Sequence, residues 1–356
     1  TNMVNIMKNH RHPAAATTKA PYLYILLVLL GTSCFAQMME KDRINAYRER
    51  NYGWPPELDE YVPSTPGWAE LQARRFEQIS HIPDTSDRYS AYVTNIYNAM
   101  FVKNFTELGW GLVRAPEHIF AELQGSLEDA LRNVDGDVHS LPNEIDIRGV
   151  EGEHKSKFIS QDDLNWKILN ELLPQHEEWA GVKLTPQNAY GLRLYQNNTN
   201  MLMHIDNHST HVISGILHVG RSPDSEPWPL VIEDFEGNTN EVYLAPGDLL
   251  FYESSKCVHG RPKKFDGSWY TSLFLHYYPS LDWDLKTEMS DEVHYRVPPS
   301  WNEQNATKLE VEELVVRSGG VTMFEPACED KWCGLKDSVK RYRSSAPAED
   351  SLNEEL

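Results

Sequence analysis

The sequence predicts an α+β protein in which a double-sheet jelly roll or barrel is braced by preceding α-helices. Three observations support this fold class. The 356 residues are 40% hydrophobic and 11% aromatic, which is ample for a core. Amphipathic helical patterns lie between residues 116 and 173. After Pro186, short apolar segments alternate with turn residues, and regularly spaced short strands favour a jelly roll or barrel.

The chain is strongly acidic, with a formal net charge of −20 at pH 7. Nucleic acids and anionic membrane surfaces attract basic patches, so neither is expected to be the main partner. A small molecule or a basic peptide suits this charge better.

Residues 1–36 have the features of a secretory signal. Lys8, Arg11 and Lys19 precede the apolar run Tyr22–Leu30, and small residues follow where a signal peptidase cuts. The run is shorter than the roughly 20 residues of a membrane span, so a cleaved signal is favoured over an uncleaved anchor. We expect the secretory pathway, either the endoplasmic reticulum lumen or secretion, and a membrane partner only if the segment stays uncleaved. The final "NEEL" is a weak hint of retrieval to the endoplasmic reticulum.

The four cysteines agree with that compartment. Cys34 would leave with the signal, and Cys328 and Cys333 in "CEDKWC" can close a small loop. A metal site at this pair is the rival interpretation, but no second pair completes four ligands. Cys257 remains as an odd thiol.

Residues 37–185 are expected to form an irregular and helical support region. The part up to about residue 90 shows no clear periodicity, whereas helices are predicted from Pro116 to Val134 and from Asp162 to Leu173. Their apolar faces should pack against a sheet as ordinary core helices. These faces consist of Ile119, Leu123, Leu127, Leu131 and Val134 in the first helix and Leu164, Ile168 and Leu172 in the second.

Residues 186–280 are expected to form the jelly-roll domain, and residues 281–356 a C-terminal extension. The "APGD" step predicts a hairpin corner, and the charged residues after Lys336 predict a disordered tail. The predicted strands are "YGLRLYQ", "THVISGILHV", "PLVIEDF", "EVYLAPGDLLFYES" and "WYTSLFLHYYP".

A polar cluster, "MHIDNHSTH", stands at the start of this region. Residues two apart on a strand point to the same face, so His204 and Asp206 can both point inward. On a helix they would lie roughly 200° apart, and the comparable His176 in "HEE" is therefore expected at the surface. His208 and His211 could orient a ligand, although a surface role is at least as plausible.

A third ligand follows 53 positions after Asp206. His259 comes directly after the predicted strand "DLLFYESSKCV", and a jelly roll brings opposite strands to one mouth. Two imidazoles and one carboxylate on one face of a metal leave three positions open, as in non-haem Fe(II) oxygenases. Surface histidines near a turn are the alternative.

The chain resembles the Fe(II)- and 2-oxoglutarate-dependent dioxygenases of the prolyl 4-hydroxylase type over residues 188–279. The similarity lies in "YGLRLYQNNTNMLMHID", "THVISGILHV", "APGDLLFYESSKCVHGRP" and "GSWYTSLFLHYYP". It implies a double-stranded β-helix (jelly roll) with Fe(II) held by His204, Asp206 and His259. It also implies 2-oxoglutarate as cosubstrate and O2 as oxidant, with ascorbate as a supporting reductant.

The chain departs from this family at the residue that binds the far carboxylate of 2-oxoglutarate. Members place Lys or Arg about ten positions after the second histidine, where this chain reads "SWY". Arg261 is the first candidate for this role and Arg193 the second, because an arginine can form two hydrogen bonds to a carboxylate. Tyr195 and Ser272 stand where the family places hydroxyls that contact the same acid.

The expected activity is hydroxylation of a peptidyl residue, with release of succinate and CO2. Proline is the first candidate, followed by lysine, asparagine or aspartate, and a basic, Pro-rich peptide would be attracted to the acidic chain. Two alternatives remain, a lumenal jelly-roll binding module with a degenerate site and a cupin-type metal protein without cosubstrate.

Overall fold

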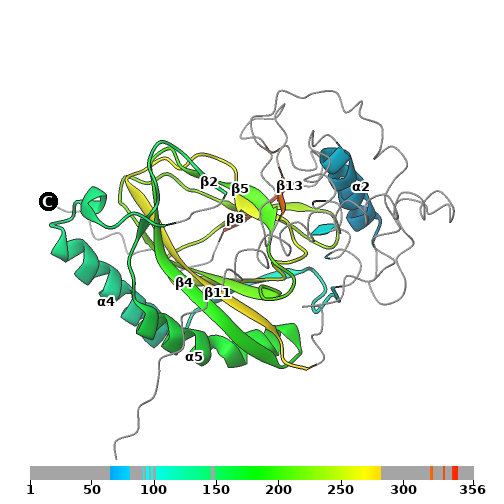
Figure 1. Ribbon diagram of the computed structural model, residues 1–356, viewed down its shortest axis with the longest axis horizontal. Helices are drawn as coiled ribbons and strands as arrows, with labels where there is room; N and C mark the ends of the chain where they lie inside the picture. The colour runs from blue at the N-terminus through cyan, green and yellow to red at the C-terminus, as the bar shows by residue number, and fades with distance from the viewer. Residues whose placement is uncertain are drawn as a thin grey trace, which may run out of the picture.

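Two β-sheets form the centre of the molecule. The computed structural model describes residues 65–80, 102–145, 149–281, 321–323 and 339–343, with the single positions 91, 94, 95, 98 and 332. One sheet has the strand order β1-β9-β6-β11-β4-β3, and the other has the order β12-β5-β10-β7-β8-β13 with β2 paired to β5. The sheets lie one above the other in Figure 1.

The strands β4 to β11 form a jelly roll. Four of them, β9-β6-β11-β4, are neighbours in the first sheet, and the other four, β5-β10-β7-β8, are neighbours in the second. All pairings among them are antiparallel, which confirms the predicted double-sheet architecture. The bounds are β4 Leu184–Gln196, β5 Asn200–Ile205, β6 Ile213–Arg221, β7 Leu230–Glu233, β8 Thr239–Tyr243, β9 Asp248–Tyr252, β10 His259–Arg261 and β11 Trp269–Pro279.

The segments before and after the jelly roll add strands to both sheets. β1 pairs with β9 and β3 with β4, while β12 pairs with β5. A short 3-10 helix, η2, lies between the strands of the N-terminal region. The bounds are β1 Trp110–Arg114, η2 Val138–Ser140, β2 Val150–Glu151, β3 Lys157–Phe158 and β12 Val321–Met323.

The predicted disorder after Lys336 is wrong for Val339–Arg343, which forms strand β13. β13 pairs in parallel with β8, and Lys340 lies opposite Asn240 in the register. Charge does not prevent this pairing, because the ladder uses backbone groups. Arg341 also donates to Glu241, with 2.8 Å between Nε and Oε2.

The helices α4 (Glu117–Asn133) and α5 (Asp162–Ala180) cover the outer face of the β4–β11 sheet, as Figure 1 shows. Their predicted apolar faces are confirmed. The buried cluster on this face contains Ile119, Leu123 and Leu127 of α4, Ile168, Leu169 and Leu172 of α5, and Leu273, Leu275 and Tyr277 of β11.

Helix α5 continues seven residues beyond its predicted end. Pro174 favours a helix end near this point, but the helix runs on to Ala180 because its last turns are buried against the sheet. The expected surface position of His176 is wrong, since its side chain is fully buried. Its ring packs edge-on against Phe251 and at a tilt against Tyr277, with ring centroids 4.6 and 4.4 Å away.

A glycine makes room for that histidine. A Cβ on Gly215 of β6 would lie 2.6 Å from His176 Nε2, so no larger residue fits there without a shift. The ring donates from Nδ1 to the carbonyl of Leu172 at 2.8 Å. Burial lowers the pKa of His176 to about 4, so the ring is neutral at physiological pH.

The region up to about residue 90 was expected to be irregular, yet it contains helix α2 (Pro66–Ser80). Thr65 caps this helix by accepting the backbone N–H of Trp68 at 3.0 Å, and proline is favoured in the first turn. Trp68 is buried against the second sheet, and Arg74 Nη1 donates to the buried Glu233 of β7 at 3.0 Å. Helix α2 is therefore part of the packed fold.

The "APGD" turn does not close a hairpin. It joins β8 of the second sheet to β9 of the first, so it is a corner between sheets. The N–H of Asp248 donates to the carbonyl of Ala245 at 2.9 Å, and Gly247 adopts a φ of +85°, which favours glycine.

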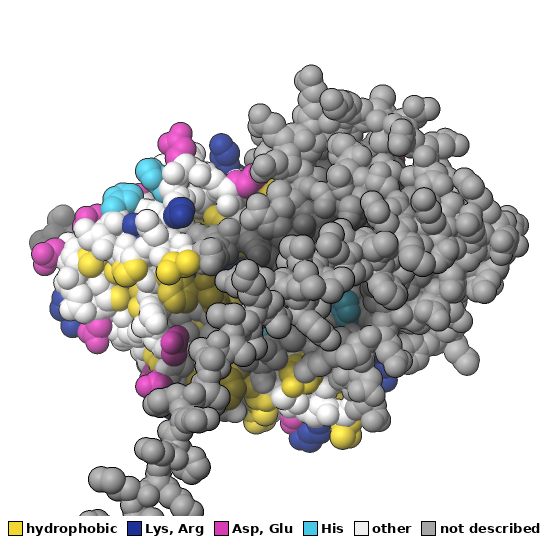
Figure 2. Space-filling model, viewed as in Figure 1, with side chains coloured by type: hydrophobic (Ala, Val, Ile, Leu, Met, Phe, Trp, Pro, Cys, Tyr) yellow, Lys and Arg dark blue, Asp and Glu magenta, His cyan; other side chains and the backbone are white. Residues whose placement is uncertain are grey.

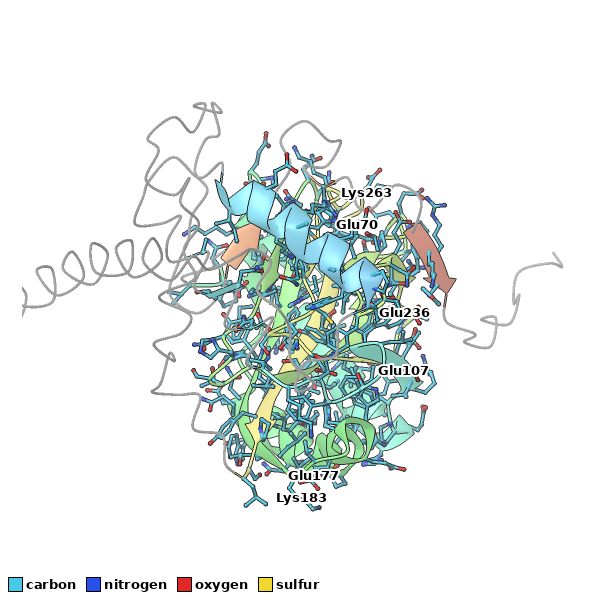
Figure 3. The ribbon with its side chains drawn as sticks, turned by 90° about the vertical axis from the view of Figure 1, so that its right-hand side faces the viewer. Glu70, Glu107, Glu177, Lys183, Glu236 and Lys263 are labelled. Carbon is cyan, nitrogen blue, oxygen red and sulfur yellow. The ribbon has the colours of Figure 1, made fainter. Side chains whose placement is uncertain are left out.

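The described surface carries mixed charge. On the face in Figure 2, acidic, basic and hydrophobic side chains are interspersed over the described part. Figure 3 shows Lys183 and Glu177 together at one end of the molecule, where their side chains form a 2.6 Å ion pair, and Lys263 near the other end. Among the described residues, no helix is both long enough and apolar enough to cross a membrane.

Of the cysteines and the signal-like segment considered in the sequence analysis, the structure describes only Cys257. Cys257 is a buried free thiol. The signal-like residues 1–36 and the pair Cys328 and Cys333 lie outside the described residues.

Candidate metal and 2-oxoglutarate site

The end of β5 and the start of β10 bring together the three residues that the sequence singled out. His204 is the penultimate residue of β5, and Asp206 is the first residue after that strand. His259 lies directly opposite His204 in the antiparallel ladder. It does not directly follow the preceding strand as expected, because β9 ends at Tyr252 and His259 is the first residue of β10.

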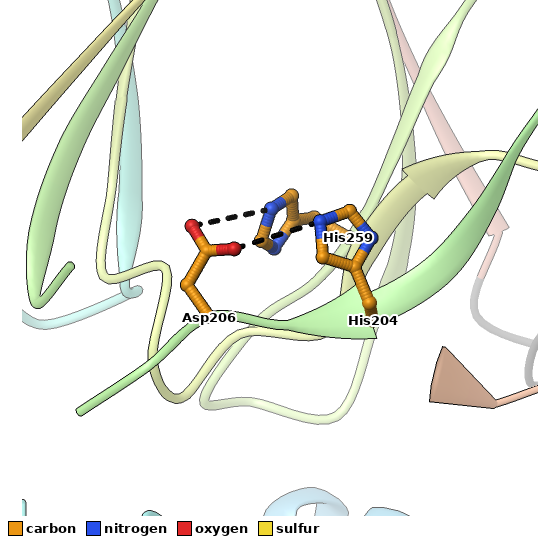
Figure 4. A group of neighbouring side chains, drawn as sticks. All are labelled: His204, Asp206 and His259. Carbon is orange, nitrogen blue, oxygen red and sulfur yellow. Dashed lines mark ion pairs between the residues drawn. The ribbon is translucent and has the colours of Figure 1, made fainter. Parts of the chain in front are cut away.

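The ligand atoms of the three side chains converge on one point (Figure 4). His204 Nε2 is 3.6 Å from Asp206 Oδ1, and His259 Nε2 is 3.9 Å from Asp206 Oδ2. All three ligand atoms lie within 4.8 Å of one another. The His204 and Asp206 side chains are 24% and 16% exposed, against 4% for His259, so the group opens to solvent on the β5 side.

Both imidazoles are oriented by the same local contact. His204 Nδ1 donates to the carbonyl of Leu202 at 2.8 Å, and His259 Nδ1 donates to the carbonyl of Cys257 at 2.9 Å. A carbonyl can only accept, so Nδ1 carries the proton in each ring and Nε2 keeps its lone pair. Second hydrogen bonds of this kind orient metal-binding histidines in proteins.

The charges at this point favour cation binding. Burial and the neighbouring His204 lower the pKa of His259 to about 4, which keeps its ring neutral at physiological pH. Burial alone would raise the pKa of Asp206, but His259 and His204 hold it below its usual value. Two imidazoles and one carboxylate that meet at one point match the ligands of a divalent transition metal.

Arg261 lies two residues after His259 on the same strand and is buried. Its guanidinium packs against the rings of both Trp228 and Tyr270, 4.7 and 4.6 Å from their centroids. It donates to the carbonyl of Trp228 at 2.6 Å and to the hydroxyl of Tyr270 at 3.0 Å. Within the described residues, Arg261 forms no ion pair.

Arg193 on β4 has a different environment. Its Nε and Nη2 donate to the two carboxylate oxygens of Glu144 at 2.6–2.9 Å, and Glu144 is only 1% exposed. A third donor, Nη1, reaches the hydroxyl of Tyr195 at 3.2 Å. The charge of Arg193 is thus already neutralised by the protein.

Tyr195 and Ser272 lie close to these arginines. Tyr195 packs edge-on against Trp228 at 5.0 Å, and Ser272 is the register partner of Arg193. The Oγ of Ser272 is buried and has no hydrogen-bond partner within the described residues. A buried hydroxyl without a partner suits a polar ligand at this place.

His218 is a polar neighbour that the sequence analysis did not select. It pairs with Ser272 in the register and stacks on Tyr270 at 4.1 Å, with the rings 9° from parallel. Its Nδ1 donates to the carbonyl of Thr271 at 3.0 Å, which leaves the buried Nε2 without a described partner. The sequence did contain a signal for His218. His218 and Ser214 are four positions apart and so point to the same face of β6, which is otherwise apolar apart from Arg221 at its end.

The two remaining histidines of the "MHIDNHSTH" cluster, His208 and His211, are neither fully buried nor fully exposed. His211 is half-buried and its ring contacts that of His276, with centroids 4.1 Å apart. His208 is also half-buried and lies two residues after Asp206. Lys263 and Lys264, two further basic residues close to Arg261 in the sequence, are exposed.

No protein-family model and no curated protein matches the sequence. Solved structures similar to this chain include a prolyl-4-hydroxylase from Pseudomonas putida, with 17% identity and a TM-score of 0.35 over 54% of this chain and 98% of that one. A prolyl hydroxylase from Trichoplax adhaerens, in complex with a hypoxia inducible factor peptide, has 17% identity and a TM-score of 0.37 over 57% and 94%. HygX from Streptomyces hygroscopicus, with nickel and 2-oxoglutarate bound, has 11% identity and a TM-score of 0.35 over 49% and 84%.

Proposed function

We propose that this protein is an Fe(II)- and 2-oxoglutarate-dependent dioxygenase that hydroxylates a peptidyl residue and releases succinate and CO2. One observation carries the proposal. His204 Nε2, His259 Nε2 and the carboxylate of Asp206 meet within 4.8 Å at an end of the jelly roll that is open to solvent. Such a set occupies one face of an Fe(II) ion and leaves three positions for cosubstrate and O2.

Arg261 is our first candidate for the residue that binds the far carboxylate of 2-oxoglutarate. A buried charge without a counter-ion is costly, and a bound carboxylate would compensate it. Arg193 is a weaker candidate because it is already paired with Glu144. The hydroxyls of Tyr195 and Ser272 lie in the same part of the interior and can donate to the same acid.

The residues of this chain would hold and orient the reactants. When bound, Fe(II) and 2-oxoglutarate supply the oxidising chemistry that inserts oxygen from O2 into a C–H bond. The protein fixes the two imidazoles through the carbonyls of Leu202 and Cys257, so the metal and the reactants would be held in a set geometry. Ascorbate would serve as the reductant that keeps the iron in its ferrous state.

A peptidyl substrate, with proline the first candidate, agrees with the formal charge of −20. Basic, Pro-rich peptides would be attracted to the chain, and this attraction would weaken as salt screens it. We also propose a location in the secretory pathway, in the endoplasmic reticulum lumen or outside the cell, on the basis of the signal-like residues 1–36.

The test is a metal-binding and turnover assay with the variant Asp206→Ala. Removing the only carboxylate ligand should abolish Fe(II) binding and succinate formation, because two neutral imidazoles bind the cation weakly. Succinate is measured by mass spectrometry with Fe(II), 2-oxoglutarate, ascorbate and a set of cationic Pro-rich peptides, and a single added oxygen should appear on a peptide.

The matched control is Asp129→Ala, which removes an exposed carboxylate from α4. It should bind iron and turn over like the wild type. Normal turnover by Asp206→Ala would refute the metal site. Iron binding without any 2-oxoglutarate turnover in the wild type would favour a binding module or a cupin-type protein instead.

A further inference from the structure

A second polar group lies on the inner face of β11, next to the candidate metal site. His276 pairs with Ser214 of β6 and Asn188 of β4 in the sheet, and only 8% of its surface is exposed. Its ring contacts that of His211, with centroids 4.1 Å apart and the ring planes tilted by 44°. Neither the metal ligands nor the candidate 2-oxoglutarate contacts include His276.

A chain of three contacts fixes the proton of this imidazole. The hydroxyl of Ser254 lies 2.8 Å from the carbonyl of His211 and 2.7 Å from the hydroxyl of Ser214, and Ser214 Oγ lies 2.9 Å from His276 Nδ1. The carbonyl can only accept, so Ser254 must donate to it. Ser214 must then donate to Ser254, and its oxygen accepts from Nδ1–H of His276.

The opposite nitrogen of the ring is therefore unprotonated. Nε2 of His276 forms no hydrogen bond within the described residues, while Nδ1 is used by Ser214. Burial and the neighbouring His211 keep the pKa of His276 well below its usual value, so the ring stays neutral. His276 thus offers a hydrogen-bond acceptor to the interior, held in a fixed orientation.

The same chain of contacts connects His276 to the metal site. The carbonyl of Ser254 accepts the backbone N–H of Asp206 at 2.9 Å. This contact orients Asp206, which stands just beyond the end of β5. Ser254 therefore ties the backbone of one metal ligand to the residue that orients His276.

The chemistry of the acceptor excludes the cosubstrate as its partner. 2-Oxoglutarate carries only carboxylate and keto oxygens at neutral pH, and all of these accept hydrogen bonds. They match the donors of Arg261, and the lone pair of His276 would repel them. The interior therefore has a donor end for the cosubstrate and an acceptor end for a different ligand.

We propose that Nε2 of His276 accepts a hydrogen bond from an N–H group of the peptide substrate and so positions that substrate beside the metal site. This inference rests on the proposed function. It adds that the substrate carries an amide or ammonium N–H close to the carbon that is attacked. A proline residue has no N–H, so in a Pro-rich peptide the donor must belong to a neighbouring residue.

Two isosteric variants separate the acceptor from the structural contact. In His276→Asn the side-chain amide can still donate to Ser214, but the acceptor at the Nε2 position is lost. In His276→Gln an amide oxygen reaches the Nε2 position, and the contact with Ser214 is lost instead. His276→Phe removes both.

The experiment measures the binding of fluorescein-labelled cationic, Pro-containing peptides to protein with Fe(II) and 2-oxoglutarate under nitrogen, where no turnover occurs. His276→Asn and His276→Phe should weaken binding about 3- to 10-fold, the size of one neutral hydrogen bond, whereas His276→Gln should stay within about 2-fold. If His276 acted only through its contact with Ser214, then His276→Gln and His276→Phe, which both lose this contact, would bind the peptides more weakly than His276→Asn.

N-methylation of single peptide bonds supplies the matching change on the ligand. At one position, N-methylation should weaken binding to the wild type by a similar factor and should not weaken binding to His276→Asn further. The proposal is overturned if no peptide of the set binds the wild type, if Asn binds as tightly as the wild type, or if every N-methylation acts equally on both proteins. Succinate formation by the wild type and Asp206→Ala without peptide tests the proposed function separately.

Discussion

The two buried arginines of the interior differ in their counter-ions. Arg193 forms a bidentate ion pair with Glu144, and its Nη1 donates to the hydroxyl of Tyr195. Among the described residues, Arg261 has only a backbone carbonyl and a phenol as hydrogen-bond partners, and it packs against two aromatic rings. The comparison shows that burial and charge alone do not indicate a ligand site. The presence or absence of a protein carboxylate separates a structural arginine from one that can bind an anion.

The largest expected effect concerns Arg193. Burial opposes its ionisation, but Tyr195 and Glu144 hold the pKa of Arg193 above its usual value. Arg193→Leu leaves the Glu144 carboxylate buried without its cationic partner, and the free energy of unfolding should fall by about 3–5 kcal/mol. Urea denaturation followed by tryptophan fluorescence measures this change.

The double variant Arg193→Leu with Glu144→Leu is the matched control. It removes both charges and should recover most of the lost stability, because an ion pair and an apolar pair of similar volume are often close in energy. Equal instability of the single and double variants would mean that packing, and not the ion pair, determines the role of Arg193.

In contrast to Arg193, Arg261 should contribute little to stability and much to the binding of 2-oxoglutarate. Arg261→Met removes a buried charge without a carboxylate partner, so the free energy of unfolding without ligand should change little or rise. The half-saturating concentration of 2-oxoglutarate should increase about 10- to 100-fold, because a charge-assisted hydrogen bond contributes about 1.5–3 kcal/mol. The affinity for Fe(II) should stay nearly intact.

The half-saturating concentration of 2-oxoglutarate is measured from succinate formation at graded 2-oxoglutarate, and the affinity for Fe(II) is measured by titration with Fe(II). The stabilisation of the wild type by 2-oxoglutarate in thermal unfolding should also disappear in Arg261→Met. If Arg193→Leu raises the 2-oxoglutarate requirement and Arg261→Met does not, the roles of the two arginines are reversed.

The sequence indicated the strands of the jelly roll and the three candidate metal ligands but little of what surrounds them. The spacing of His204 and Asp206 reflects strand parity, which is a local property, whereas His259 meets His204 through the pairing of β5 with β10, two strands that are far apart in the sequence. The turn residues and apolar runs likewise predicted the strands of the jelly roll. Short-range patterns of this kind survive in a single sequence.

The partner of Arg193 illustrates what a sequence does not show. Glu144 stands in the loop "LPNEID", 49 positions away, and no periodicity connects the two residues. Tertiary packing also overrode local preference at Pro174, which α5 passes through, and at His176, which is buried over Gly215. Strand β13 formed despite its charge, because the open edge of β8 supplies backbone partners.

The smallest expected effect concerns the pH dependence of the free energy of unfolding, through the titration of His218 close to Arg261. Burial and the positive charge of Arg261 lower the pKa of His218 to about 3. The unfolded chain takes up this proton near pH 6.5, while the folded chain resists it until about pH 3. The free energy of unfolding therefore falls as the pH decreases from 6.5 towards 3, by up to roughly 1.4 kcal/mol per pH unit from this group.

Arg261→Met should reduce this acid loss without changing the pH at which it begins. The unfolded state is the same, so the loss still starts near pH 6.5, but the pKa of His218 in the folded state rises and the loss ends at a higher pH. The difference at pH 4 should be below about 1.4 kcal/mol, and urea denaturation between pH 7 and 4 measures it. Other buried histidines, such as His176, contribute equally to both proteins and cancel. In a His218→Phe background the difference should vanish, and its persistence there would mean that Arg261 acts on another titrating group.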